Sequence, residues 1–210
     1  DLRDLIIPFA LIGVPILIIM IAQRETGSAL VFLSFLLVFY RQGMTGYVLG
    51  WGVASIVLFI LVIRFGEVAL PIGVGNVGSL VSTLLIHATA IGVSIAKEKD
   101  FRSLVIISLG VLACYGIGLL LNIWIQINFN YIGIASLALT AIYLLVQSIK
   151  NRKLSYGWIA GFVLFSAVLC QGCDYAFHNI LQRHQRVRIE VLLGMKDDPH
   201  GAGHNVNQSL

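Results

Sequence analysis

An acidic residue lies where it could act as a base, in a polar link between two apolar runs. Glu25 is at the centre of this link, residues 23–28, which reads QRETGS. A carboxylate held at a membrane surface can take a proton from a hydroxyl nucleophile or steer a substrate. The structural alternative is a capped helix start, with Thr26 or Ser28 as the N-cap and Glu25 stabilised by the helix dipole. Spacing alone leaves both interpretations open.

A second group of chemically useful residues opens the polar C-terminal segment. Apolar residues lie among the first charges of this segment, which predicts an amphipathic segment lying on the outer leaflet of the membrane: Val187, Ile189, Val191, Leu192 and Leu193. Guanidinium groups match phosphate oxygens bidentately, so Arg186 and Arg188 could bind a phosphate. Attraction to anionic lipid headgroups explains them equally well.

Few other ionisable residues lie in or near the apolar runs. Glu67 and Asp174 fall at the ends of runs, and His87 is the one ionisable residue near the middle of a run. We expect His87 to be a buried hydrogen-bonding partner, because no carboxylate accompanies it in its run to form a proton relay. Glu67 follows Arg64 by three residues, which predicts an ion pair at the membrane interface.

Two motifs are better explained by packing than by chemistry. Gly73, Gly75 and Gly78 form a G-x-G-x-x-G pattern, but they precede an apolar helix and no βαβ unit, so we expect close-packed or flexible backbone and no cofactor. Cys170 and Cys173 form a C-x-x-C without the βαβ pattern of redox proteins. Their expected role is helix packing, with a disulfide or reactive thiol as the alternative. The histidines of the tail lack metal-ligand spacing, so no metal is expected.

The elements that position these residues can be predicted from the composition. The 210 residues are 58% hydrophobic and 11% charged, whereas a soluble chain carries about 25% charged residues. This composition excludes a soluble enzyme, a disordered tail and a disulfide-stabilised secreted domain. Nucleic acid is excluded as a partner as well, because the basic residues lie between apolar runs instead of forming a patch.

We therefore predict an all-α, polytopic membrane protein, since only helices satisfy the backbone in lipid here. We expect the transmembrane region to be residues 1–178, followed by a polar segment, residues 179–210, which by the family resemblance given below would begin a large outer loop. Seven apolar runs are long enough to be predicted spans: residues 5–22, 27–40, 46–64, 77–96, 103–126, 131–149 and 156–178.

Positive charges predict the orientation of these spans. One set of connecting segments holds eight Lys and Arg residues and the alternate set holds two before the tail. Basic residues concentrate on the cytoplasmic side of membrane proteins. The N-terminus is therefore expected in the cytoplasm, and the C-terminal segment, after seven spans, outside.

Two segments resemble the SEDS family (shape, elongation, division and sporulation), most closely its RodA-like branch. The segment QRETGSAL, residues 23–30, is similar to the family's Gln-Pro-Asp/Glu-x-Gly-Ser/Thr turn. The tail HQRVRIEVLLGMKDDPHGAGHNVNQS, residues 184–209, is similar to the start of the family's outer loop. There, Gln-Arg-x-Arg leads to Asp-Pro-x-Gly-Ala-Gly-Tyr and then Gln-Ser.

The resemblance implies a peptidoglycan glycosyltransferase that polymerises lipid II, the undecaprenyl-pyrophosphate-linked disaccharide-pentapeptide. Such enzymes work in the bacterial inner membrane, among its lipids, with a class B penicillin-binding protein as partner. By this resemblance Glu25 is the candidate catalytic residue, and Gln23, Arg186 and Arg188 are candidate substrate-binding residues. A carboxylate would deprotonate the attacking sugar hydroxyl, and arginines would stabilise the pyrophosphate leaving group. No cofactor or metal is implied.

The chain also departs from the family pattern. Arg24 replaces the usual proline, and His204 stands where tyrosine is common. The family's presumed catalytic aspartate lies further along the outer loop than Leu210, so we expect these 210 residues alone to be an inactive central fragment. Between the two motifs the family commonly has two spans, whereas six are predicted here, so four resemble an insertion.

Two other functions fit the same residues. A flippase or transporter for a polyprenyl-linked lipid would also use several spans and an outer basic surface. A non-catalytic scaffold that recruits the enzymes of cell-wall elongation would need no chemistry at all.

Overall fold

The computed structural model describes residues 10–11, 13–15, 18, 35–41, 43 and 46–196. The chain divides into two compact units, residues 1–54 and 55–210. In the first unit the structure describes the helix α3 (Phe35–Arg41). The predicted spans at 5–22 and 27–40 lie largely outside the described residues.

Among the described residues, five helices are long and apolar enough to cross a membrane, so the chain is a polytopic helical membrane protein. They are α4 (Gly46–Gly66), α5 (Val77–Glu98), α6 (Phe101–Asn122), α7 (Phe129–Asn151) and α8 (Leu154–Tyr175). A π-helical turn, η2 (Ala176–Ile180), continues α8, and the short helix α9 (Arg183–Leu192) follows. The last five predicted spans are confirmed as helices, with ends that shift by a few residues. The largest shift is in α6, which ends at Asn122 and not at residue 126. Beyond this end, the side chain of Asn122 accepts a hydrogen bond from the backbone N–H of Ile127 (3.1 Å).

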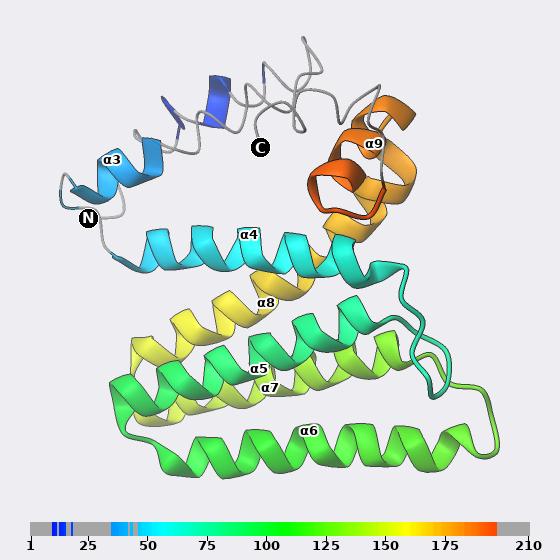
Figure 1. The fold of residues 1–210 in the computed structure, drawn as a ribbon. Helices are drawn as coiled ribbons and strands as arrows, with labels where there is room; N and C mark the ends of the chain where they lie inside the picture. The colour runs from blue at the N-terminus through cyan, green and yellow to red at the C-terminus, as the bar shows by residue number, and fades with distance from the viewer. Residues whose placement is uncertain are drawn as a thin grey trace. The chain divides into compact units, whose positions relative to one another are not determined.

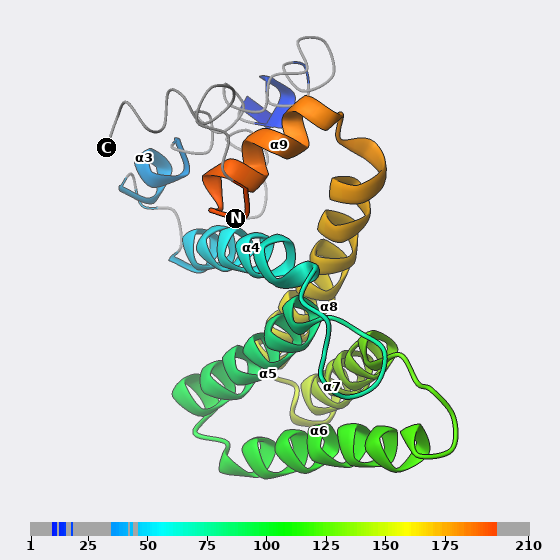
Figure 2. The same ribbon diagram turned by 45° about the vertical axis from the view of Figure 1, so that its right-hand side comes forward.

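The four helices α5 to α8 form one bundle in the second unit. Helices α7 and α8 pack along their lengths, α5 packs against both, and α6 packs against α5 and α7 (Figures 1 and 2). The core between them is apolar: Ile86, Leu144, Ala160 and Val163 are almost fully buried. Tight packing of these side chains holds the helices in one arrangement.

Small polar side chains share this core. Ser94, Ser136 and Thr140 are buried, and each hydroxyl donates to a carbonyl of its own helix at 2.8–2.9 Å. Their hydrogen bonds are therefore satisfied without a partner helix, while their small size lets the helix backbones approach. The hydroxyls of Ser82 and Ser166 are buried without a hydrogen-bond partner among the described residues.

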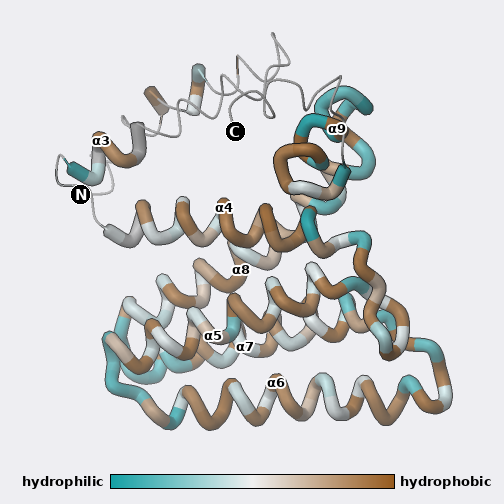
Figure 3. Tube along the Cα trace, in the orientation of Figure 1, coloured by the Kyte–Doolittle hydropathy of each residue, from teal (hydrophilic) through white to brown (hydrophobic). Residues whose placement is uncertain are grey.

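Helix α6 presents an apolar surface outside the bundle. Leu109, Leu112 and Leu120 are each at least 60% exposed. Figure 3 shows apolar residues along the length of α6, with hydrophilic residues at the turn that joins it to α5. An exposed, wholly apolar helix surface of this length is expected to face lipid.

The two ends of the bundle are built differently. At one end α5 and α7 each stop at a residue with left-handed backbone, Lys99 (φ 52°) and Arg152 (φ 51°), and tight turns lead into α6 and α8. At the other end the segments that precede α5 and α7 pair as a short parallel bridge. Val74 donates to the carbonyl of Ile127 (3.3 Å), and Phe129 donates to that of Val74 (2.7 Å). The bundle therefore consists of two helical hairpins that start from a shared backbone contact.

Candidate functional site

The candidate site residues fall into two groups. Gln23 and Glu25 lie outside the described residues, as does the tail segment 197–210 that carries most of the second motif. Arg186 and Arg188 are described, and both lie on α9. Helix α9 therefore carries the candidate site residues that the structure describes.

Helix α9 adopts the amphipathic form that its sequence predicts. It begins with a capping box, in which the backbone N–H of Gln182 donates to the side chain of Gln185 (3.1 Å). Ile189 and Leu193 lie on its apolar side and pack against the hydrophobic core. This apolar contact fixes which face of α9 is turned to the core.

Arg186 is held against the end of α8. Its Nη2 donates to the carbonyl of His178 (2.9 Å), and its guanidinium lies 5.7 Å from the ring centroid of Phe177. Phe177 itself is 2% exposed, so the arginine covers a buried ring. Both contacts come from η2, a π-helical turn of the kind that often occurs at functional sites.

Arg188 has a different environment from Arg186. It is exposed, and residues two apart on a helix point to different faces. The structure therefore does not bring the two arginines together as one clamp: Arg186 fixes α9 to η2, and Arg188 is the one available to a phosphate.

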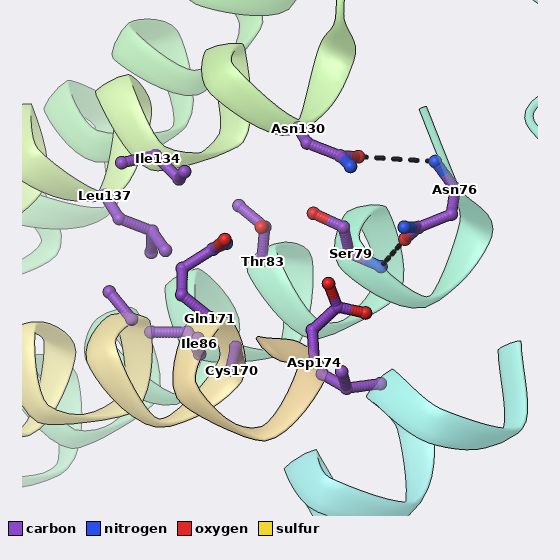
Figure 4. A pocket seen from close by; sticks show the side chains of 12 residues that line it. Asn76, Ser79, Thr83, Ile86, Asn130, Ile134, Leu137, Cys170, Gln171 and Asp174 are labelled. Carbon is purple, nitrogen blue, oxygen red and sulfur yellow. Dashed lines mark hydrogen bonds between the residues drawn. The ribbon is translucent and has the colours of Figure 1, made fainter. Parts of the chain in front are cut away.

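A polar cleft lies between α5, α7 and α8, at the end of the bundle from which α9 leaves. Figure 4 shows the side chains that line it. Its polar lining residues are Asn76, Ser79, Thr83, Asn130, Gln171 and Asp174, above an apolar floor that includes Ile86, Leu137 and Cys170. The cleft has a volume of about 30 Å³, room for about one or two water molecules.

The walls of the cleft are held by hydrogen bonds to backbone. Asn76 caps α5, because its Oδ1 accepts from the N–H of Ser79 (2.7 Å). The N–H of Asn76 in turn donates to Oδ1 of Asn130 (3.3 Å), at the start of α7. These bonds fix the relative position of two helix starts that are 54 residues apart in sequence.

Asp174 brings a negative charge to the rim of the cleft. Its Oδ1 lies 3.5 Å from Nδ1 of His178, one helical turn further along, and both side chains are about half exposed. Nδ1 of His178 is also within 2.9 Å of the carbonyl of Asp174. The carboxylate thus connects the cleft to the π-helical turn that contacts Arg186.

His87 is a buried hydrogen-bonding partner, as expected. It is 3% exposed, and its Nδ1 lies 2.7 Å from the carbonyl of Thr83. Its Nε2 is buried without a partner among the described residues. No carboxylate contacts it among the residues that the structure describes.

A second polar cluster occupies the opposite end of the bundle. Asp100 caps α6 by accepting from the N–H of Ser103 (3.1 Å), and its Oδ2 accepts from the hydroxyls of Ser103 (2.6 Å) and Tyr156 (2.7 Å). These bonds, with that of the Ser103 hydroxyl first, hold the pKa of Asp100 below its ordinary value. Beside them Glu98 pairs with Lys153 and accepts from Ser155.

The remaining motifs have structural roles. A Cβ on Gly78 would lie 2.9 Å from the backbone of Gly66 and of Leu61, so the glycine motif marks close packing of α5 on α4. Cys170 and Cys173 are free thiols in α8. Among the described residues, no group of three or more His, Cys, Asp or Glu side chains could hold a metal.

The predicted Arg64–Glu67 ion pair is wrong. Helix α4 ends at Gly66, so Glu67 lies in the turn beyond it and not on the helical face of Arg64. The guanidinium of Arg64 instead lies 5.7 Å from the ring centroid of Phe65.

Sequence reasoning missed the cleft. The available signals were an asparagine at the start of each of two apolar runs, Asn76 and Asn130, and the pair Gln171 and Asp174 at helical spacing near the end of another. Each residue taken singly has an ordinary explanation as a cap or an interfacial side chain, and only the packing of three helices brings them together.

Comparisons with protein-family models, with curated proteins and with solved structures found no match to this chain.

Proposed function

We propose that this chain is part of a RodA-like peptidoglycan glycosyltransferase of the bacterial inner membrane, which polymerises lipid II into glycan strands. The observation that carries the proposal is the placement of the arginine segment. Helix α9 comes after the last span and η2, is docked by its apolar face, and leaves Arg188 exposed beside the end of the membrane bundle. Arg188 is therefore placed where it could bind a phosphate carried by a membrane lipid.

The proposed mechanism uses the residues in the roles that the family resemblance implies. Glu25 removes the proton from the attacking sugar hydroxyl. Arg188 stabilises the negative charge that develops on the pyrophosphate leaving group. Arg186 supports this step by holding α9 against Phe177 and the carbonyl of His178. Gln23, two residues before Glu25, contributes to substrate binding.

Polymer formation tests the proposal. The protein is produced as its own gene encodes it, reconstituted with labelled lipid II and a class B penicillin-binding protein, and its products are separated by length. Glu25→Gln is expected to reduce the polymerisation rate by at least about 100-fold, the usual contribution of a general base. The matched control is Glu67→Gln, which changes an exposed carboxylate in the turn after α4. Normal polymer from Glu25→Gln, or equal losses from both variants, would contradict the proposed role.

The polar cleft favours a second candidate, a flippase for a polyprenyl-linked lipid. Transporters of this class place helix starts at a polar site, and here Asn76 caps the start of α5 and donates from its N–H to Asn130 near the start of α7. Translocation of fluorescent lipid II across vesicles by the purified protein, without polymer, would support this function and exclude the first.

A further inference from the structure

We propose that the cleft between α5, α7 and α8 binds a hydroxyl or amide group of a carbohydrate. This inference deepens the proposed function and rests on it for the source of the sugar. The hydrogen-bonding groups, the size and the charge of the cleft support it separately.

The cleft offers both hydrogen-bond donors and hydrogen-bond acceptors to a ligand. The side-chain oxygens of Asn76 and Asn130 each accept one backbone N–H group, and the NH2 group of each residue can still donate. Asp174 offers carboxylate oxygens, which are hydrogen-bond acceptors. Gln171 is exposed and makes no side-chain hydrogen bond to the described residues, so its amide can both donate and accept.

A ligand that satisfies this set must itself donate and accept. Hydroxyl and secondary amide groups do both, and a sugar carries several of them close together. Ser79, Thr83 and Asp174 all line the cleft, and Figure 4 shows their polar ends turned toward the same space.

The charge of the cleft argues against the other small ligands. Neither Lys, Arg nor His is among the described residues that line it, and Asp174 would repel a phosphate. A metal cation is disfavoured because Asp174 is the one carboxylate among the described residues that line the cleft. The N-termini of α5 and α7 also border the cleft, and helix N-termini repel positive charge.

The size of the cleft limits how much of a sugar it can hold. A volume of about 30 Å³ accommodates one substituent and not a whole ring. Ile86 and Leu137 form a floor that is at most 4% exposed, which suits the methyl end of an acetamido group or the carbon of a hydroxymethyl group. The ring itself would lie across the rim, beside Gln171.

The position of the cleft fits a lipid-linked sugar. Asn76 and Asn130 stand at the starts of two spans, so the mouth of the cleft lies at the ends of these spans and its floor lies further along them. Its rim residue Asp174 contacts His178, whose carbonyl accepts from Arg186. The sugar site and the arginine helix are therefore connected through one turn of η2.

Direct binding of a small sugar tests the proposal without requiring catalysis. The full-length protein in lipid nanodiscs is titrated with the methyl glycoside of N-acetylglucosamine, and saturation-transfer-difference NMR measures the dissociation constant. Gln171→Ala and Asp174→Asn are each expected to weaken binding by about threefold to tenfold, the effect of one lost hydrogen bond. Gln126→Ala is the matched control, because Gln126 is an exposed glutamine at the same end of the bundle that does not line the cleft.

The outcomes separate this proposal from the proposed function. Saturable binding that depends on Gln171 and Asp174 but not on Gln126 supports the site, even if no polymer forms. Displacement of the glycoside by lipid II identifies the lipid-linked sugar as the ligand, and lack of displacement identifies a free sugar. Equal affinities in all variants, no saturable binding, or competition by methyl phosphate would overturn the site. Thermal unfolding of each variant shows whether a lost signal reflects lost folding.

Discussion

The hydroxyl of Tyr156 donates a 2.7 Å hydrogen bond to Oδ2 of Asp100, which lies 56 positions earlier in the chain. Tyr156 is in the first turn of α8 and Asp100 caps α6. The bond therefore joins the turn between α5 and α6 to the start of α8. Together with the pair between Glu98 and Lys153, it ties the two hairpins together at one end of the bundle.

This contact predicts a pH-dependent stability. Because folding lowers the pKa of Asp100, its ionised form stabilises the fold above the ordinary carboxyl pKa of about 4. That stabilisation is lost as the pH falls through the lowered value. Asp100→Asn is expected to lower the midpoint of thermal unfolding at pH 7, and the difference from wild type should shrink below about pH 4. Unfolding in detergent, monitored by circular dichroism, measures both. An equal difference at all pH values would contradict the assignment, with Glu67→Gln as the control.

Gly78 and Gly92 on α5 give opposite predictions for the same substitution. A Cβ at Gly78 would lie 2.9 Å from the backbone of α4, whereas Gly92 has nothing within 4 Å. Gly78→Ala is therefore expected to destabilise the protein by about 1–3 kcal/mol, because the backbone must move. Gly92→Ala is expected to be neutral or stabilising by up to about 1 kcal/mol. Unfolding free energies in mixed micelles compare the two, and equal effects would mean that α4 and α5 are not in contact here.

Substitutions of Arg186 and Arg188 are expected to have different effects, the first on stability and the second on binding. Arg186→Ala removes a hydrogen bond to the carbonyl of His178 and the cover over Phe177, which should destabilise the fold by about 2 kcal/mol. Arg188→Ala should leave stability unchanged and weaken binding of lipid II, since Arg188 is exposed. Thermal unfolding and a lipid II binding assay on both variants separate the effects. A stability loss at Arg188, or none at Arg186, would show that α9 docks by another face.

Cysteine labelling tests the predicted orientation. Gln126 lies between α6 and α7, and Lys99 lies between α5 and α6, at opposite ends of the bundle. In a background without native cysteines, Gln126→Cys should react with a membrane-impermeant maleimide added outside the cytoplasmic membrane. Lys99→Cys should react only after that membrane is permeabilised. The reverse pattern would show that the excess of positive charge lies outside.

The spans could be predicted from the sequence because each depends on a local property. A run of about 20 apolar residues is enough to define α4 to α8, wherever they pack. The close approach at Gly78 was also predictable in kind, since a glycine-rich start of an apolar helix indicates tight packing. Which helix it approaches was not, because that depends on the turn of residues 67–76 between α4 and α5.

The site residues show where local reasoning fails. Arg186 and Arg188 are close together in the motif and were expected to act together, but the helical period turns them to different surroundings. Arg64 and Glu67 would share a face if α4 continued, yet the helix ends between them. Asn76, Asn130 and Asp174 meet only through the packing of three helices, which no spacing in the sequence records.

The residues that line the cleft show where the polypeptide enters and leaves the four-helix bundle. It is lined by Asn76, just before the first helix of the four-helix bundle, and by Asp174, near the end of the last. The polypeptide therefore enters and leaves this bundle at neighbouring points on one side of the membrane. A block of helices with adjoining ends can be spliced between two existing spans without forcing them apart or inverting the downstream spans.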